Sequence, residues 1–274
     1  MTGSIRPLRS DLVSHLPEYG IEAAGLAAIV FVAALATAIV TTRLDAISPL
    51  HQRMLEAALV AATVLAMTYS PWGKRSGAHY NPAVTLTFLA LGRMRRADAA
   101  CYIAAQAVGA LIGIAAAALI AGAALRDPPV FWIVTRPGAD GTLAALAGEF
   151  AVAFLLMSTV LVAGGISALK PFVGVFAAFL VFLFICVEAP LSGFSMNPAR
   201  SLASALPAGA WNGFWIYVLA PPAGMLAAAL VNRSVPNLPC TRCAKVQGSP
   251  HQRCIHCGYE PGCSDLATGG SSPS

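Results

Sequence analysis

The 274-residue chain is 57% hydrophobic and only 11% charged, with a formal net charge of +5. Because soluble domains carry about 25% charged residues, this composition argues against a soluble enzyme and favours a membrane protein. The positive charges are spread over loops without a basic helix or an aromatic platform, so we expect no nucleic-acid partner.

Six apolar segments are about long enough to cross the ~30 Å hydrocarbon layer of a bilayer. They cover residues 21–42, 54–72, 98–125, 143–166, 171–189 and 214–232. The first 17 residues are polar, and no small-residue cleavage pattern follows the first apolar run, so we expect that run to be an uncleaved span. An even number of spans places both termini on one side of the membrane.

The basic residues predict which side that is. Lys and Arg accumulate in cytoplasmic loops, and with both termini inside, 12 of the 17 basic residues fall on the cytoplasmic side or in the two tails. The sequence therefore predicts a multi-pass protein of the cell membrane, with a cytoplasmic N-terminal tail at 1–17 and a cytoplasmic C-terminal tail at 233–274.

The tripeptide Asn-Pro-Ala occurs twice, each time in a Gly/Ala-rich apolar stretch. The two copies are Asn81, Pro82, Ala83 and Asn197, Pro198, Ala199. Asn favours the helix N-cap and Pro the first helical position, so each copy predicts a helix start. The apolar runs that follow, 83–91 and 199–206, cover only about 14 Å and cannot span a bilayer. Short helices paired in matching halves indicate a permeation site.

Further matches indicate that the chain arose by duplication. Each half has a Glu near the start of its first span, and the third span of each half repeats one spacing pattern. The matched positions are Glu22 with Glu149, and Tyr102, Gln106 and Gly109 with Tyr217, Pro221 and Gly224. Three spans per half is an odd number, so we expect inverted repeats at about 18–125 and 143–232, whose short helices point their N-termini at the membrane centre.

These short helices predict a barrier to ions. An N-cap Asn uses its side-chain oxygen on helix N–H groups, so we expect Asn81 and Asn197 to present both amide N–H groups to the lumen. Each helix N-terminus adds about half a positive charge, which repels cations and hydronium. Arg200 costs about 2.5–3.5 kcal/mol at membrane depth unless it faces a cavity or a partner, so it predicts a polar lumen. The alternative is that each Asn only caps a helix in a packed bundle.

Together these motifs resemble the aquaporin and glycerol-facilitator channels. The similar stretches are the two loops at 76–85 and 197–201, the paired Glu residues and the Tyr102 pattern, within a region from about 18 to 231. The resemblance implies an all-α membrane protein with six transmembrane helices and two half-membrane re-entrant helices in a channel domain at 18–232. It also implies a homotetramer with one pore per subunit.

The same resemblance places a selectivity constriction on a small set of side chains. These are Ile185, Phe194, Arg200 and either Val60 or Ala61, the last pair left open by an apparent insertion at 71–74. Strict water channels usually carry His where Ile185 falls, whereas glycerol facilitators usually carry Asp where Ser201 follows the Arg. We therefore expect glycerol, urea or hydrogen peroxide to pass beside water. The alternative is that Phe194 and Ile185 close the constriction.

The paired acids have two interpretations. By resemblance, Glu22 and Glu149 support the two re-entrant loops, accepting hydrogen bonds from backbone N–H groups that the membrane would leave unsatisfied. Alternatively, they are proton-relay carboxylates of a coupled transporter, because acids within a membrane often mark ion pathways.

The C-terminal tail has its own motif, two Cys-x-x-Cys pairs. Its members are Cys240, Cys243, Cys254 and Cys257. Four thiolates at this spacing predict a closed structural zinc site that resembles a zinc ribbon at 240–257, and a reducing cytoplasm disfavours disulfides. Iron or a redox dithiol are the alternatives, and a cytoplasmic partner of the tail is a further expectation.

No catalytic constellation or open metal site stands out, so we expect no enzyme and no cofactor for transport. The sequence predicts a passive channel in the lipid bilayer for water and small uncharged solutes. The alternatives are a poorly conducting or gated scaffold or sensor that acts through its zinc tail, and a proton-coupled transporter.

Overall fold

The computed structural model describes residues 12–241, 243–248 and 251–258. Residues 1–11 of the predicted N-terminal tail, together with 242, 249–250 and 259–274 of the predicted C-terminal tail, lie outside the described residues. The described part of the chain contains helices and no strand. The first labelled helix is α2.

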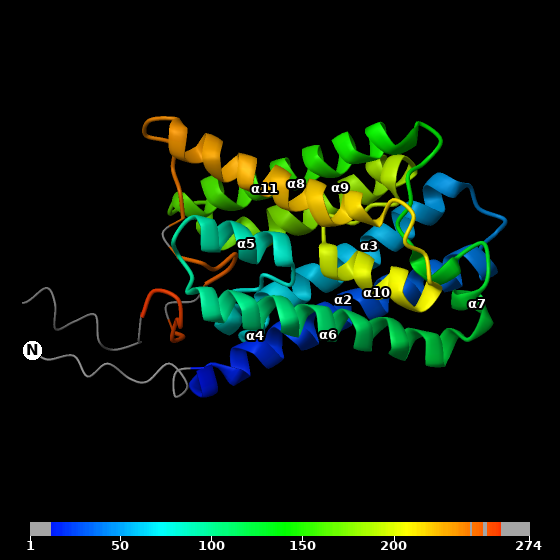
Figure 1. The fold of residues 1–274 in the computed structure, drawn as a ribbon, viewed down its shortest axis with the longest axis horizontal. Helices are drawn as coiled ribbons and strands as arrows, with labels where there is room; N and C mark the ends of the chain where they lie inside the picture. Colours follow the sequence, from blue (N-terminus) through cyan, green and yellow to red (C-terminus); the bar gives the residue numbers. More distant parts are fainter. Residues whose placement is uncertain (1–11, 242, 249–250, 259–274) are drawn as a thin grey trace, which may run out of the picture.

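Six long helices form a bundle (Figure 1). They are α2 (Leu16–Arg43), α3 (Pro49–Tyr69), α6 (Arg96–Ala121), α8 (Gly141–Gly165), α9 (Val173–Ser192) and α11 (Phe214–Ser234). Among the described residues, five helices are long and apolar enough to cross a membrane, and they coincide with five of the six predicted spans. The remaining predicted span, at residues 54–72, corresponds to α3, which is not among those five.

The second predicted span differs most from the structure. Its helix α3 begins at Pro49 because the Ser48 hydroxyl caps it, and it ends at Tyr69 rather than continuing to residue 72. Ser70 then accepts a hydrogen bond from the backbone N–H of Gly73 and starts a separate short helix, α4 (Pro71–Ser76). The first turns of α3 carry Arg53 and Glu56, which lower its mean hydropathy, yet α3 packs between α2 and α9.

Two short helices lie inside the bundle and meet end to end (Figure 1). They are α5 (Pro82–Ala90) and α10 (Pro198–Ala208), and each begins at an Asn-Pro pair. At 1.5 Å per residue they cover about half of a bilayer. Each also crosses between the halves of the chain, since α5 packs on α11 and α10 packs on α6. The connectors α7 (Ala123–Arg126), η1 (Phe131–Ile133) and η2 (Lys170–Phe172) join the longer elements.

Matched glycines bring the long helices together in each half. A Cβ at Gly109 of α6 would overlap the carbonyl oxygen of Ala23 on α2, and a Cβ at Gly224 of α11 would overlap the carbonyl oxygen of Phe150 on α8. The absence of a side chain lets the backbones approach closely, as is usual for helices in membranes. The α2–α6 and α8–α11 pairs therefore form equivalent contacts in the two repeats.

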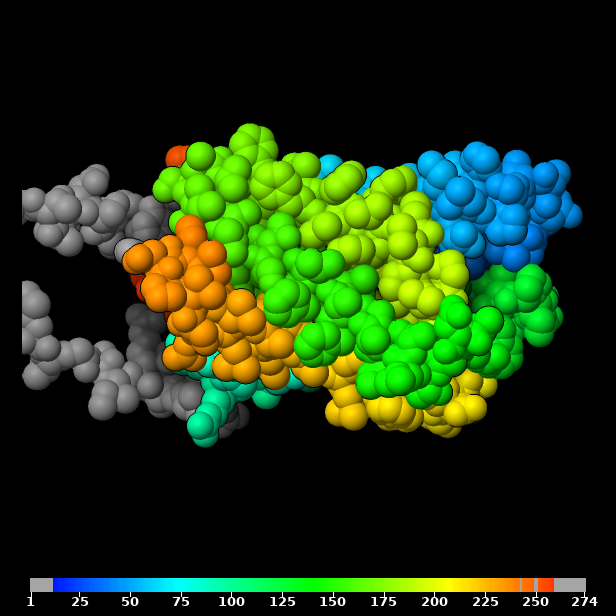
Figure 2. Space-filling model, turned by 90° about the horizontal axis from the view of Figure 1, so that it is seen from above, coloured from blue at the N-terminus to red at the C-terminus, as the bar shows by residue number. Residues whose placement is uncertain are grey.

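The outer surface of the bundle is apolar. Large aliphatic side chains that point outward include those of Leu119, Leu143, Val187 and Leu230. Figure 2 shows α8 and α11 side by side on one face, with the segment between α2 and α3 projecting at the end away from the C-terminal tail. An apolar exterior is what the hydrocarbon layer of a bilayer requires.

Candidate functional site

Two loops with one conformation lead into the short helices. Residues 76–81 and 192–197 both read Ser-Gly-x-x-x-Asn. The backbone is left-handed at matched positions that are not glycine: φ is 54° and 46° at Ala78 and Tyr80, and 52° at both Phe194 and Met196. Left-handed conformations are costly for such residues, so hydrogen bonds must hold the loops in this shape.

Two buried carboxylates supply those hydrogen bonds. Glu22 on α2 accepts from the backbone N–H groups of His79 (3.1 Å) and Tyr80 (2.6 Å). Glu149 on α8 accepts from the backbone N–H groups of Ser195 and Met196, both at 2.7 Å. Further donors to the two carboxylates are the side chains of Ser76, Gln106 and Ser192. Each carboxylate thus binds the loop of its own half, and Glu22 also accepts from Gln106 on α6.

The two capping asparagines are joined to the opposite loop. The side-chain oxygen of Asn81 accepts from Ala83 N at 2.8 Å, and that of Asn197 accepts from Ala199 N at 3.1 Å. The Asn81 amide donates to the carbonyl of Met196 at 2.7 Å, and the Asn197 amide donates to the carbonyl of Tyr80 at 2.8 Å. The sequence predicted two free N–H groups on each amide. The structure leaves one, because the other bridges the two repeats.

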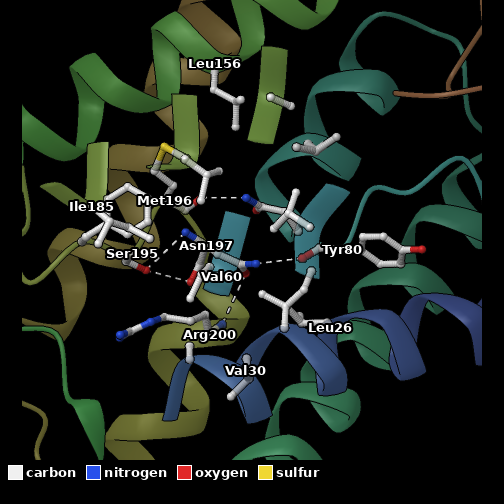
Figure 3. Close-up of a pocket in the computed structure, with 18 of the residues that line it drawn as sticks. Leu26, Val30, Val60, Tyr80, Leu156, Ile185, Ser195, Met196, Asn197 and Arg200 are labelled. Carbon is white, nitrogen blue, oxygen red and sulfur yellow. Dashed lines mark hydrogen bonds between the residues drawn. The ribbon is translucent and has the colours of Figure 1, made fainter. Parts of the chain in front are cut away.

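A cavity of about 310 Å³ runs past this junction (Figure 3). Its walls are mainly aliphatic side chains of α2, α3, α8 and α9, including Leu26, Val30, Val64, Leu156, Val160 and Val181. One polar strip crosses them, formed by the two loops with Asn81 and Asn197. Polar side chains outside this strip are those of Thr37, Glu56, Thr68 and Arg200.

The residues predicted for the constriction differ in where they lie. Ile185, Phe194, Arg200 and Val60 line the cavity, whereas Ala61 is not among its lining residues. Figure 3 shows Val60, Ile185 and Arg200 around one pocket. Arg200 Nη1 has no hydrogen-bond partner in the part of the chain that the structure describes. Arg200 is the only Arg or Lys among the described lining residues.

Several polar residues of the site were not predicted from the sequence. The sequence assigned no individual role to Ser76 or Ser192, yet each donates its hydroxyl to the Glu of its half. The backbone carbonyl of Ser76 accepts from the Tyr102 hydroxyl, and that of Ser192 accepts from the Tyr217 hydroxyl. Their equal spacing of five residues before an Asn was a readable signal. The contact of Ser201 with Thr135 (2.8 Å) had no such signal, because Thr135 lies outside both repeats.

The cysteines of the tail do not form the predicted set of four. The Sγ of Cys243 lies 3.3 Å from that of Cys254 and 3.5 Å from that of Cys257. Among the described residues, Cys240 is not in this group. Its Sγ instead accepts a hydrogen bond from Arg93 Nη2 at 3.1 Å, and the next residue, Thr241, donates its N–H to the Leu161 carbonyl. The channel helices therefore hold Cys240 away from the other three.

The three clustered thiols suit a soft metal ion. Sulfur atoms on one tetrahedral zinc at ~2.3 Å lie about 3.8 Å apart, so these thiolates need to separate by only a few tenths of an ångström. A hydrogen bond from Cys243 lowers the pKa of the Cys254 thiol below its ordinary value, which favours the thiolate that metals bind. Burial lowers the pKa of the neighbouring His256 to about 3, so that imidazole is neutral at physiological pH.

Comparisons with known proteins agree with this geometry. The family model described as "Major intrinsic protein" matches residues 18–232. Plant relatives include NIP-type aquaporins that are 36% identical to this chain over 169 to 225 residues. One of them is aquaporin NIP3-1 of Zea mays, where the match over 225 residues covers 81% of this chain and 71% of that protein. It is also 36% identical over 178 residues to aquaporin NIP1-1 of Arabidopsis thaliana, covering 63% of this chain and 59% of the relative. This chain thus spans about 60% of the length of several curated relatives.

A solved structure shares the fold. It is the aquaglyceroporin from Plasmodium falciparum, with a TM-score of 0.67 at 20% sequence identity, and the match covers 81% of this chain and 96% of that one.

Proposed function

Because this chain belongs to the major intrinsic protein family, we propose that it is a passive channel for water and small uncharged solutes that excludes protons and other ions. The proposal rests chiefly on one observation. Two half-length helices meet N-terminus to N-terminus beside an apolar cavity, and each capping Asn points one remaining amide N–H away from its bridge. Members of this family are passive channels, so we assign no catalytic activity.

Proton exclusion follows from the charges at this junction. The N-termini of α5 and α10 each contribute about half a positive charge. Arg200 adds a full positive charge in the first turn of α10. A water molecule at the junction accepts from Asn81 and Asn197 and cannot donate to their amide groups. Its hydrogens turn outward, so a hydrogen-bonded water chain loses the single direction that proton hopping needs. Cations meet an electrostatic barrier, whereas neutral solutes do not.

The lining of the constriction favours a broad choice of neutral solutes. Val60, Ile185 and Phe194 give it apolar walls, and Arg200 gives it one charged donor. Such a site binds hydroxyl or amide groups through Arg200 while the carbon skeleton contacts the walls. We therefore propose glycerol, urea and hydrogen peroxide as solutes beside water.

The remaining assignments complete the proposal. Asn81, Pro82, Ala83, Asn197, Pro198 and Ala199 form the pore centre, and Glu22 and Glu149 support its loops. We assign the channel domain to residues 18–232 and place both termini in the cytoplasm. The protein forms a homotetramer in the cell membrane. Zinc binds Cys243, Cys254 and Cys257 in the tail, and transport itself needs no cofactor.

The test is solute flux through the purified protein in liposomes. Stopped-flow light scattering under sucrose, glycerol and urea gradients should show fast shrinkage in sucrose and rapid re-swelling in glycerol or urea. Arg200→Val should raise solute flux relative to water flux, since it removes the charged donor and widens the constriction. Water flux no faster than in empty liposomes, with zinc present or removed, would contradict the channel function.

A further inference from the structure

The C-terminal tail docks on the first re-entrant loop. We define the plug segment as residues 239–241, 243–248 and 251–258. Within it, the N–H of Val246 donates to the Gly77 carbonyl at 2.9 Å, and Nε2 of His79 donates to the Ala244 carbonyl at 2.9 Å. These bonds involve the loop that precedes Asn81 and lines the cavity. The tail is thus attached directly to the wall of the permeation site.

The contact is an insertion and not a surface association. Val246 is itself a lining residue of the 310 Å³ cavity, and Ala244 is completely buried. Lys245 is 7% exposed, and its ammonium donates to the carbonyl of Lys74 at 2.9 Å. A Cβ at Gly77 would press against the Lys245 side chain, so the loop and the tail fit closely. Val246 of the plug segment therefore forms part of the cavity wall.

A second part of the plug segment reaches the same loop. Nε2 of His256 lies 3.4 Å from the Ser76 carbonyl oxygen and 3.3 Å from the Tyr102 hydroxyl, and its ring stacks on that of His79. Gln252 Nε2 donates to the Pro71 carbonyl at 2.9 Å. The loop is therefore held from two parts of the tail that are about ten residues apart in sequence.

The three clustered cysteines join those two parts. Cys243 immediately precedes Ala244, while Cys254 and Cys257 flank His256. One metal ion bound to the three sulfur atoms would therefore link the part of the tail that contacts His79 to the part that contacts Ser76. A short segment without a core of its own gains most of its order from such a link.

We propose that the plug segment is a metal-dependent gate, in which zinc on Cys243, Cys254 and Cys257 holds Val246 in the end of the cavity. Loss of zinc separates the two parts of the tail, weakens their hydrogen bonds to the loop and frees the cavity end. Three described thiolates fill three of the four positions of a tetrahedral ion, which leaves one position where a chelator can enter. The gate adds regulation to the channel function proposed above and rests on it.

The test uses the full-length protein in liposomes with zinc or with EDTA on both sides. Water permeability from stopped-flow light scattering should be low with zinc and rise about tenfold with EDTA, as when an open state populated at the 10% level becomes dominant. Cys243→Ser with Cys257→Ser should give the high value with or without zinc. The control Cys101→Ser lies outside the plug segment and should respond to zinc like the unaltered protein.

Two further measurements separate gating from a fault in folding. Val246→Gly keeps the three thiols, so it should bind as much zinc as the unaltered protein while conducting more water in its presence. Hydrogen exchange followed by mass spectrometry should show the Val246 amide protected with zinc and exposed with EDTA, because its bond to Gly77 forms only in the docked state.

The outcomes distinguish the gate from the channel. High permeability that is identical with zinc and EDTA would overturn the gate and leave the channel function intact. No permeability in any condition would overturn the channel function, and the exchange data would still decide whether zinc docks the segment. Exchange at Val246 that zinc does not change, or absence of bound zinc by metal analysis, would overturn the proposal.

Discussion

Asn81 and Asn197 face each other across the centre of the bundle, and each donates an amide N–H to the backbone of the loop that carries the other. The two acceptor carbonyls belong to Met196 and Tyr80, the residues immediately before the asparagines. This exchange fixes the distance between the N-termini of α5 and α10. It also sets the orientation of the one amide N–H that each Asn keeps for a permeating molecule.

Asn197→Asp should make the protein conduct protons. The carboxylate keeps the capping oxygen but loses the N–H that bonds Tyr80, and its negative charge offsets the positive helix ends. We expect proton flux well above that of the unaltered protein, measured with a pH-sensitive dye trapped in liposomes under a potassium-valinomycin potential. Asn212→Asp is the matched control, because Asn212 is exposed on a loop. Equal proton flux in both variants would contradict the electrostatic barrier.

Glu149→Gln should destabilise the protein, whereas Glu188→Gln should not. Glu149 accepts hydrogen bonds from Ser195 N and Met196 N, and the amide group of Gln would turn N–H toward one of these donors. Bonds to a charged acceptor contribute about 1.5–3 kcal/mol each. Neither carboxylate oxygen of Glu188 has a hydrogen-bond partner among the described residues, although the side chain is buried.

The measurement for this pair is the melting temperature in detergent, followed by intrinsic fluorescence. We expect a clear decrease for Glu149→Gln and an unchanged or higher value for Glu188→Gln, since Glu188 has no hydrogen-bond partner among the described residues to lose. A lower value for Glu188→Gln would mean that this carboxylate has a stabilising role.

Val60→Ala should widen the constriction. Val60 lines the cavity beside Ile185, so shortening it increases the room for a carbon skeleton next to Arg200. We expect the ratio of glycerol to water permeability to rise severalfold in stopped-flow assays. Leu59→Ala truncates the adjacent residue of α3, which is half exposed on the outer surface, and should leave the ratio unchanged. An unchanged ratio for Val60→Ala would move the constriction elsewhere.

Gly109→Ala should weaken the α2–α6 contact. The new Cβ overlaps the Ala23 carbonyl oxygen, which is backbone and cannot turn aside, so the helices must separate at a cost of about 1–3 kcal/mol. Gly20→Ala is the control on α2, since a Cβ there meets nothing, and better helix propensity should stabilise it by about 0.5–1 kcal/mol. Chemical denaturation in mixed micelles would measure both. Equal stability of the two variants would contradict the close approach.

The fold was predictable because its signals are local or repeated. Asn-Pro pairs mark helix starts within a few residues, and the spacing of Tyr102 and Gly109 recurs at Tyr217 and Gly224. The predicted all-α class with inverted repeats is confirmed by the match to a solved aquaglyceroporin. The predicted end of the second span at residue 72 was wrong, because α3 ends at Tyr69 and the Ser70 cap that starts α4 resembles an ordinary residue of a span.

Contacts between distant segments were not predictable in the same way. No local pattern indicates that the Asn81 amide donates to the Met196 carbonyl, or that the Arg93 guanidinium donates to the sulfur of Cys240. The first contact reduces the free amide donors from two to one, and the second removes a ligand from the predicted set of four cysteines. Each depends on how two segments approach in space, which the sequence motifs leave undefined.

The crossed placement of α5 on α11 and of α10 on α6 has a consequence for how the chain is made. When the ribosome has finished the first half, the Asn81 amide and the inner face of α5 still lack Met196 and α11. The pore therefore closes only after the last long helix has entered the membrane. The same dependence applies to ancestry: a single ancestral copy needed a second copy in the opposite orientation to complete its own pore.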